Sequence, residues 1–185
     1  LLISTCIIKD RVFSEEFDNN SAGWTGSINT GNSSWEIPDG ATSGNTGADV
    51  AHSGANYMNF EASNTATNQG SIVSPVIDLT AAQDAAELSF WMHAYGASMG
   101  TLDIGVGTSP TGPFTSEFTW TGPYQQAGND PWANIGVNLT AYIGQNIYIE
   151  LTQYDSLNAL GSGFDGDMSI DLFEVTTCLA CALPS

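Results

Sequence analysis

The segment Leu88-Ser89-Phe90-Trp91-Met92-His93-Ala94-Tyr95 alternates between two kinds of side chain along its whole length. The first, third, fifth and seventh positions are apolar, and the intervening ones are Ser89, Trp91, His93 and Tyr95. A period of two residues is that of a β-strand, whose successive side chains point to opposite faces of a sheet. The segment therefore predicts a strand with one face in an apolar core and an aromatic, polar face directed outward.

The same alternation recurs in short runs along the chain, separated by turns rich in glycine, asparagine, serine, threonine and proline. We expect strands at residues 11–17, 34–37, 57–61, 70–74, 86–95, 101–107, 115–120, 132–138, 146–154 and 168–175. The only short helical candidate is residues 80–87, where we expect a loop with one turn. Ten short strands with almost no helix predict an all-β fold, a jelly-roll β-sandwich of two antiparallel sheets.

The charge balance excludes several classes of partner. The chain has 185 residues, 20 acidic side chains and a formal net charge of −18, and its only fixed bases are Lys9 and Arg11. Binding to nucleic acid or to anionic lipid requires several cations, so neither is expected. No apolar run approaches the ~20 residues of a membrane-spanning helix, so no membrane insertion is expected. The acidic excess fits a protein that is secreted or at the cell surface in a salty medium.

The three cysteines, Cys6, Cys178 and Cys181, lie at the two ends of the chain. A zinc site is weakly indicated, because the C-x-x-C pair lacks a second pair at metal-ligand spacing. A disulfide from Cys6 to Cys178 or to Cys181 would join the termini, which requires neighbouring first and last strands and an oxidising compartment. We divide the chain into an N-terminal segment or linker at 1–12, a β-sandwich at 13–177, and the start of a linker to a following module at 178–185.

Several motifs occur in an order and spacing that resemble one family. They are Phe17-Asp18 followed by Gly23-Trp24, the segment 49–58, Ser74-Pro75, the region 88–102, Trp132 and the closing run 169–175. Over residues 13 to 177 they resemble the MAM domain (meprin, A5 protein, receptor phosphatase mu), in a form similar to that of secreted multidomain bacterial proteins. The resemblance implies a noncatalytic jelly-roll module for adhesion or ligand binding.

Acidic residues that match positions of this family imply a calcium site. They are Asp18, Asp49 and Asp171, and Glu16 and Glu61 are candidates to complete the shell. Calcium takes six to eight oxygen ligands, and no Lys or Arg is available to neutralise such a cluster. The alternative is that these acids cap turns at the surface. The sequence Asp165-Gly166-Asp167 lacks the full spacing of a calcium loop, and we expect a solvated turn there.

The outward-facing positions of three predicted strands form the candidate ligand surface. They are Trp91, His93, Tyr95, Asp103, Tyr148, Glu150 and Tyr154. Flat aromatic rings beside directed polar groups are what sugar recognition by a sheet requires. The alternative is that a loop or a following module covers these rings. Of the other tryptophans, Trp24, Trp35 and Trp132 are expected to pack in the core, and the loop 121–131 with Tyr124 is a further candidate platform.

We therefore expect a noncatalytic extracellular module that binds a glycan, holds a structural calcium ion and targets an attached enzyme or adhesin to polysaccharide. The alternative is a protein–protein adhesion or spacer module of a secreted cell-surface protein. An enzyme is not expected, because His52 and His93 are the only histidines and no catalytic signature occurs. A carboxylate pair such as Asp103 and Glu150 would suit glycoside cleavage, but it is more often polar surface.

Overall fold

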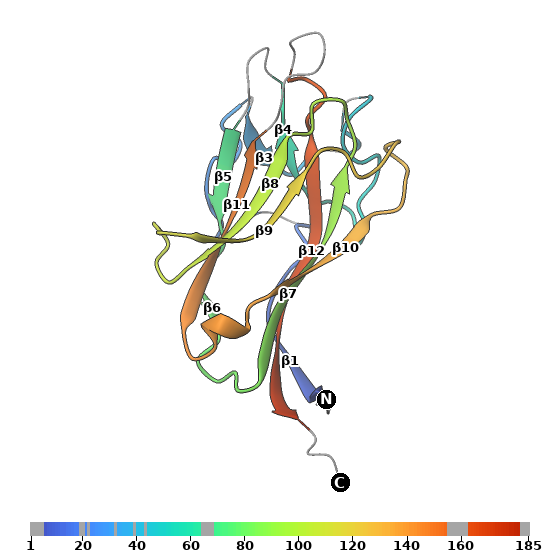
Figure 1. The fold of residues 1–185 in the computed structure, drawn as a ribbon. Helices are drawn as coiled ribbons and strands as arrows, with labels where there is room; N and C mark the ends of the chain where they lie inside the picture. Colours follow the sequence, from blue (N-terminus) through green and yellow to red (C-terminus); the bar gives the residue numbers. More distant parts are fainter. Residues whose placement is uncertain are drawn as a thin grey trace.

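Two β-sheets pack face to face in the computed structural model (Figure 1). The structure describes residues 6–18, 21, 23–31, 33–38, 40–42, 44–63, 69–154 and 163–181, with the side chains of 6–8 and 179–181 excepted. The strands are β1 (Cys6–Glu15), β2 (Thr25–Gly26), β3 (Ser34–Glu36), β4 (Met58–Glu61), β5 (Gln69–Val73), β6 (Ile77–Asp78), β7 (Ala85–Ala94), β8 (Thr101–Gly107), β9 (Thr115–Thr121), β10 (Ala133–Asn138), β11 (Asn146–Tyr154) and β12 (Met168–Cys181).

The strand order confirms the predicted all-β jelly-roll sandwich. Sheet I has the order β10-β7-β12-β4-β3, with β1 paired to β12, and sheet II has the order β2-β5-β11-β8-β9, with β6 paired to β11. The named strands pair antiparallel. Each of the ten predicted strands is present, and β2 and β6, of two residues each, were not predicted because so short a run shows no alternation.

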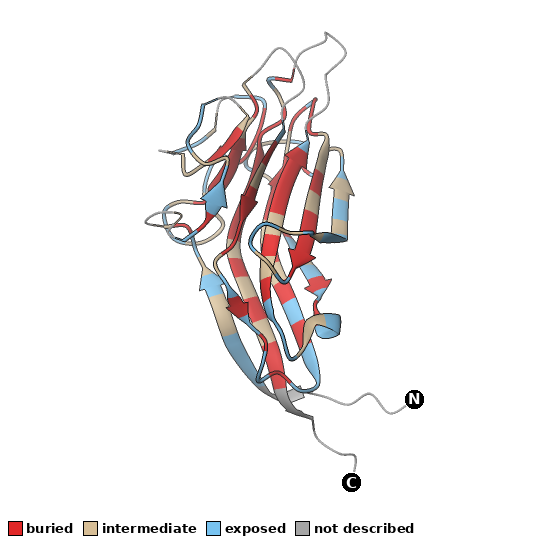
Figure 2. Ribbon diagram, turned by 90° about the vertical axis from the view of Figure 1, so that its left-hand side faces the viewer, coloured by how far each residue is buried: buried red, intermediate tan, exposed pale blue. Residues whose placement is uncertain are grey.

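The core lies between the sheets, where the predicted inward positions meet. The inward residues of β7, β8 and β11 are at most 1% exposed: Leu88, Phe90, Met92, Ala94, Leu102, Ile104, Val106, Ile147, Ile149 and Leu151. Figure 2 shows that buried positions run along the strands. Trp24 and Trp35 are buried in this core, as predicted. Each fully buried Leu, Ile, Phe or Met side chain contributes about 1.5–3 kcal/mol of transfer free energy, so the pattern of apolar positions holds the sandwich together.

The first and last long strands are neighbours, as a disulfide between the ends would require. β1 pairs with β12, and the backbone of Cys6 lies opposite that of Cys181. Cys178 is disulfide-bonded. The side chains of Cys6 and Cys181 lie outside the described residues, so the predicted link between the two ends of the chain stays a prediction. These paired strands begin before residue 13 and continue beyond residue 177, the boundaries expected for the sandwich.

Helix is sparse in the described part of the chain, which contains one 3₁₀ turn, η1 (Thr140–Tyr142). In the region 80–87 the chain makes the expected turn at Thr80 and Ala81, and β7 begins at Ala85. Among the described residues, no helix has the length and apolar character to span a membrane.

Candidate functional site

The outer face of sheet I is covered by loops. The register of β4, β12 and β7 brings polar side chains into neighbouring rows. They are at most 1% exposed: Asn59, His93, Asp167, Ser169 and Asp171. Residues 44–57 and 122–132 reach this face through hydrogen bonds: the backbone N–H of Asp167 donates to Oγ1 of Thr46 at 2.9 Å, and that of Ala94 donates to Oε1 of Gln125 at 2.7 Å. A face that alternation alone marks as outward is therefore a buried polar layer.

His93 belongs to this layer, so its predicted place on an exposed ligand surface is wrong. The side chain is 0% exposed, and neither ring nitrogen has a hydrogen-bond partner in the described part of the structure. The ring of Trp132 contacts it edge-on, with the centroids 5.4 Å apart. Burial lowers the pKa of the imidazole, against the opposing effect of Asp130 and Asp49, because the charged form is poorly solvated there.

Trp91 lies at the edge of the same face and is half-buried. The imidazole of His52 stacks on its indole at 3.8 Å between centroids and 15° between planes. Trp132 contacts the ring of Tyr57 edge-on at 5.6 Å, and its Nε1–H donates to the carbonyl of Val50 at 3.3 Å. Trp132 was expected in the core, but it packs on this outer layer, because the sandwich core lies on the other side of the sheet.

Asp18 and Asp171 both hold the loop of residues 52–56, one from the end of β1 and the other from β12. Oδ1 of Asp18 accepts from the backbone N–H groups of Ala55 at 2.5 Å and Asn56 at 3.1 Å, and these donors lower its pKa. Oδ2 of Asp171 accepts from Ser53 at 2.8 Å, and burial raises the pKa of this carboxyl. Both carboxylates therefore anchor the same loop. The groups that this loop directs at them are N–H donors, whereas a calcium ion would need further oxygen ligands there.

The other three predicted calcium ligands are Glu16, Asp49 and Glu61. Glu16 and Asp49 are exposed, and the backbone N–H of Asp49 donates to Gly128 at 2.9 Å. Glu61 ends β4, and its Oε1 accepts a hydrogen bond from Oγ of Ser63. Within the described ranges, no three His, Cys, Asp or Glu side chains form a group that could hold a metal ion. The five carboxylates therefore do not make the predicted calcium site together.

Asp167 was expected in a solvated turn, but it is 1% exposed. Its Oδ1 accepts from the backbone N–H of Ala62 at 2.9 Å, while its Oδ2 has no partner in the described part of the chain. Burial raises the pKa of this carboxyl to about 7, helped by the charges of Glu61 and Glu36. The prediction failed because the loop containing Thr46 covers the start of β12, which local sequence does not show.

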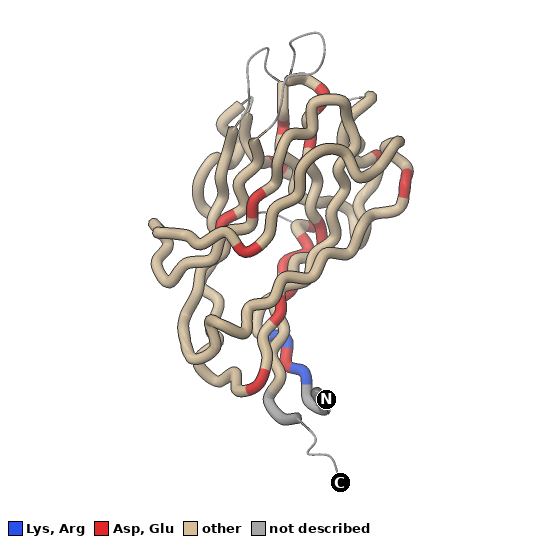
Figure 3. Tube along the Cα trace, in the orientation of Figure 1, with Lys and Arg blue, Asp and Glu red and all other residues tan. Residues whose placement is uncertain are grey.

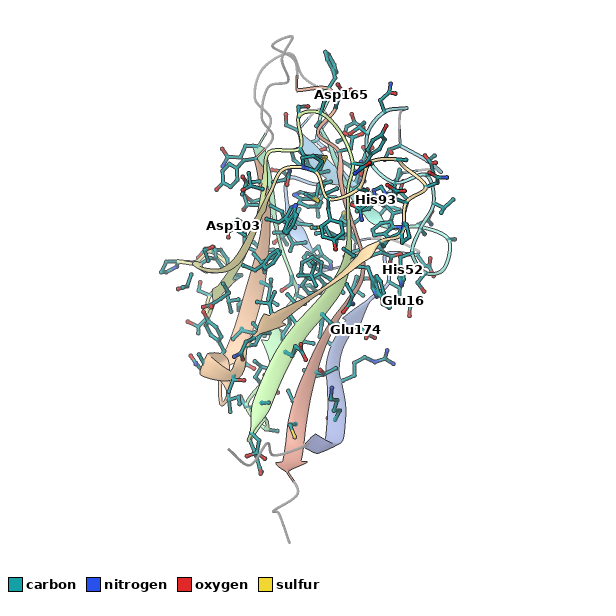
Figure 4. All side chains as sticks on the ribbon, turned by 45° about the vertical axis from the view of Figure 1, so that its right-hand side comes forward. Glu16, His52, His93, Asp103, Asp165 and Glu174 are labelled. Carbon is teal, nitrogen blue, oxygen red and sulfur yellow. The ribbon has the colours of Figure 1, made fainter. Side chains whose placement is uncertain are left out.

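The remaining predicted ligand residues lie on the outer face of sheet II, on the opposite side of the sandwich. They are Asp103 on β8 and Tyr148, Glu150 and Tyr154 on β11. Asp103 pairs with Thr152, two positions from Glu150, and its Oδ2 accepts from Ser116 at 3.0 Å. Burial, then the charge of Asp103, raises the pKa of Glu150. Figure 4 shows Asp103 on the other side of the molecule from His52 and His93. The seven residues therefore do not form one surface.

Three adjoining hollows follow the loop 122–132, which connects sheet II to sheet I. The first has a volume of about 290 Å³ and is lined by His52, Trp91, Trp132 and the segment 128–131. The second, of about 520 Å³, is lined by residues 124–126 and 130–133. The third, of about 420 Å³, is lined by Asn45, residues 95–97, Pro123, Gln125, Gln126 and Asp165. Neighbouring hollows share wall residues. We call the four aromatic residues that line them the aromatic strip: Trp91, Tyr95, Tyr124 and Trp132.

The loop behind the aromatic strip is held in place by its own polar groups. The buried amide of Gln125 donates from Nε2 to the carbonyls of Met92 at 3.3 Å and Pro131 at 3.0 Å. Oδ2 of Asp130 accepts from the backbone N–H groups of Gln126 at 2.8 Å and Ala127 at 3.0 Å. Tyr124 is 52% exposed and packs against Trp120 at 5.2 Å. The strip therefore presents aromatic rings on a preorganised backbone.

The sequence signalled Trp91 and Tyr95 through alternation and Tyr124 through the composition of its loop. No such signal marked Asn45 or Asp130. Each lies in an irregular segment, where neither period nor motif shows which way a side chain points.

Solved structures of low sequence identity share this fold. The K3 cleaved adhesin domain of Lys-gingipain from Porphyromonas gingivalis w83 is 17% identical, with a TM-score of 0.57 over 90% of this chain and 98% of that one. A xylan-binding domain from CBM 22 is 10% identical, with a TM-score of 0.52 over 92% and 96%. A Stig cyclase from Fischerella sp. TAU is 13% identical, with a TM-score of 0.51 over 89% and 88%. These likenesses show the fold alone, which adhesion, binding and catalysis have all used.

The sequence itself gives the closer relationship. The closing strand β12, the adjacent β1 and the Asp18 and Asp171 anchors lie in the part of the chain that carries the motifs noted above. A family model described as "MAM domain, meprin/A5/mu" matches residues 16–178. The chain therefore belongs to the MAM domain family.

Proposed function

We propose that this chain is a noncatalytic extracellular module that binds carbohydrate along the aromatic strip and targets an attached enzyme or adhesin to polysaccharide. The observation that carries the proposal is the row of adjoining hollows in which four aromatic rings stand beside amide and carboxylate groups. A location outside the cell, secreted or at the cell surface, is part of the same proposal, because that is where such polysaccharides occur.

The chemistry of the aromatic strip suits a sugar. A half-buried ring offers one apolar face to the C–H groups of a pyranose, while nearby polar groups bind its hydroxyls. Trp91, Tyr95 and Trp132 are half-buried, and the polar groups come from Asn45 and Gln126. The fixed orientation of the loop lowers the entropy that binding would otherwise cost.

The charge of the molecule narrows the class of sugar. The net charge is −18, and the two basic residues lie on β1 near the N-terminus, far along the sandwich from the loop 122–132 (Figure 3). Sulfated polymers would meet only like charge, so we propose neutral glycans, or acidic glycans bridged by calcium, as ligands. The xylan-binding domain of the same fold supports a neutral xylan as the first polymer to test.

Replacing Tyr124 with alanine is expected to weaken binding to a neutral polysaccharide by roughly tenfold, since loss of an aromatic contact in a binding site costs about 1–2 kcal/mol. The side chain is 52% exposed, so its removal should leave the fold intact. The measurement is retardation in affinity electrophoresis across a panel of neutral and sulfated polysaccharides, with the dissociation constant taken from its dependence on polymer concentration.

The matched control is Tyr154→Ala, because Tyr154 is also exposed, at 42%, but lies on sheet II. Retardation that persists in this variant and is lost in Tyr124→Ala supports the aromatic strip. The reverse result would move the binding surface to sheet II. Absence of retardation on every polymer would contradict carbohydrate binding and favour the alternative of a protein–protein adhesion or spacer module.

A further inference from the structure

Asp167 is a buried carboxylate that is only half satisfied. It is 1% exposed, and among the described residues its side chain accepts one hydrogen bond, from the backbone N–H of Ala62 to Oδ1 at 2.9 Å. Its Oδ2 has no partner in the described part of the chain. Burying a charged oxygen without a partner is costly, and native proteins rarely keep such a group without an ion or a ligand.

The neighbours of Asp167 have the same charge. Phe60 of β4 pairs with Met168 of β12, so Glu61 and Asp167 continue this register side by side at the ends of the two strands. Glu36, on the next strand β3, is half-buried, and both burial and the charge of Glu61 raise its pKa. The two fixed bases of the chain, Lys9 and Arg11, pair with Cys178 and Thr176, at the far end of β12 from Asp167, so neither can neutralise these carboxylates.

We propose that Asp167 and Glu61 bind a divalent cation of the calcium class, with Glu36 adding to the negative field. Carboxylate oxygens are the ligands such an ion prefers, and water and carbonyl oxygens normally complete its shell. The hydrogen bond from Ala62 holds Oδ1 and so fixes the orientation of Oδ2. This site shares only Glu61 with the acids that the sequence suggested, and it is separate from the loop anchors Asp18 and Asp171.

The proposal predicts a calcium-dependent melting temperature that depends on Asp167. At a calcium concentration about 100-fold above the dissociation constant, wild-type protein should melt roughly 5–10 °C higher than in chelator. Asp167→Asn and, independently, Glu61→Gln should lose most of this rise. Asparagine keeps an oxygen for the N–H of Ala62, so the variant is expected to fold. The measurement is thermal melting at pH 7.5 with calcium chloride or with EGTA, backed by calorimetric titration with calcium alone.

The control variants separate this site from the predicted one. Asp49→Asn, at an exposed position, should keep the full response to calcium. Asp18→Asn should keep it too, and is expected to melt lower in both conditions because it weakens a loop anchor. The proposal is overturned if wild-type protein shows no response, if Asp167→Asn and Glu61→Gln respond like wild type, or if only Asp18→Asn loses the response. These outcomes are independent of polysaccharide binding, which is scored with Tyr124→Ala.

Discussion

Replacing Phe173 with alanine is expected to lower the free energy of unfolding by about 3–5 kcal/mol, the range for a fully buried phenylalanine. Phe173 is 0% exposed on β12. Its ring contacts Phe13 at 6.2 Å, Trp24 at 5.4 Å and Phe90 at 6.1 Å between centroids. These neighbours come from β1, from the segment before β2 and from β7, so the cavity would lie where three separate parts of the chain meet.

The measurement is urea denaturation followed by tryptophan fluorescence, with the stability taken from the midpoint at constant slope. The matched control is Phe164→Ala, since Phe164 is 46% exposed and its loss should cost less than about 1 kcal/mol. An unchanged midpoint for Phe173→Ala would mean that the aromatic cluster does not hold β1 and β12 to the core.

The second large effect is a pH dependence caused by Asp167. Burial, with the charges of Glu61 and Glu36, raises its pKa in the folded protein to about 7, above the ordinary value of 3.8. As the pH rises, Asp167 therefore loses its proton at a lower pH in the unfolded chain than in the folded protein. Its contribution to the free energy of unfolding is fully present below about pH 4 and is lost as the pH rises to about 7. The difference between these pKa values corresponds to about 4 kcal/mol. Asp167→Asn is expected to remove this loss and to be the more stable protein at pH 8.

The measurement is urea denaturation of both proteins from pH 4 to pH 8 in buffers stripped of divalent cations, and the quantity of interest is the difference between them. Taking the difference cancels the contribution of His93 to the free energy of unfolding. Because the pKa of His93 is lowered, this contribution falls as the pH drops below 6.5, which is the direction opposite to that of Asp167. Asp49→Asn is the matched control and should follow the wild-type profile. Parallel profiles for wild type and Asp167→Asn would show that this carboxylate is not desolvated. Calcium should flatten the wild-type profile if the proposed cation site is correct.

Alternation alone was sufficient to predict the sandwich and its inner faces. In the segment 88–95 the four apolar positions are all 0% exposed, and the same reasoning placed Ile104 and Ile149 correctly. The predicted strands match because a period of two residues is a local property, and burial of one face against a second sheet is what stabilises it. The adjacency of the first and last strands, required by the proposed disulfide, was also anticipated.

The tertiary structure alone decided what lies over each outer face and which carboxylates meet. Alternation predicts that His93 points away from the core. It does not show that His93 is buried in contact with Trp132, because that depends on pairing between distant strands and on two long loops. Alternation also predicts that Trp91 and Glu150 point outward. It does not show that they belong to different sheets and face opposite sides of the sandwich. The burial of Asp167 beside Glu61 depends on the register of β4 and β12, strands separated by more than 100 residues. A local pattern of residues predicts which way a side chain points. What surrounds that side chain is decided by contacts between segments far apart in the sequence.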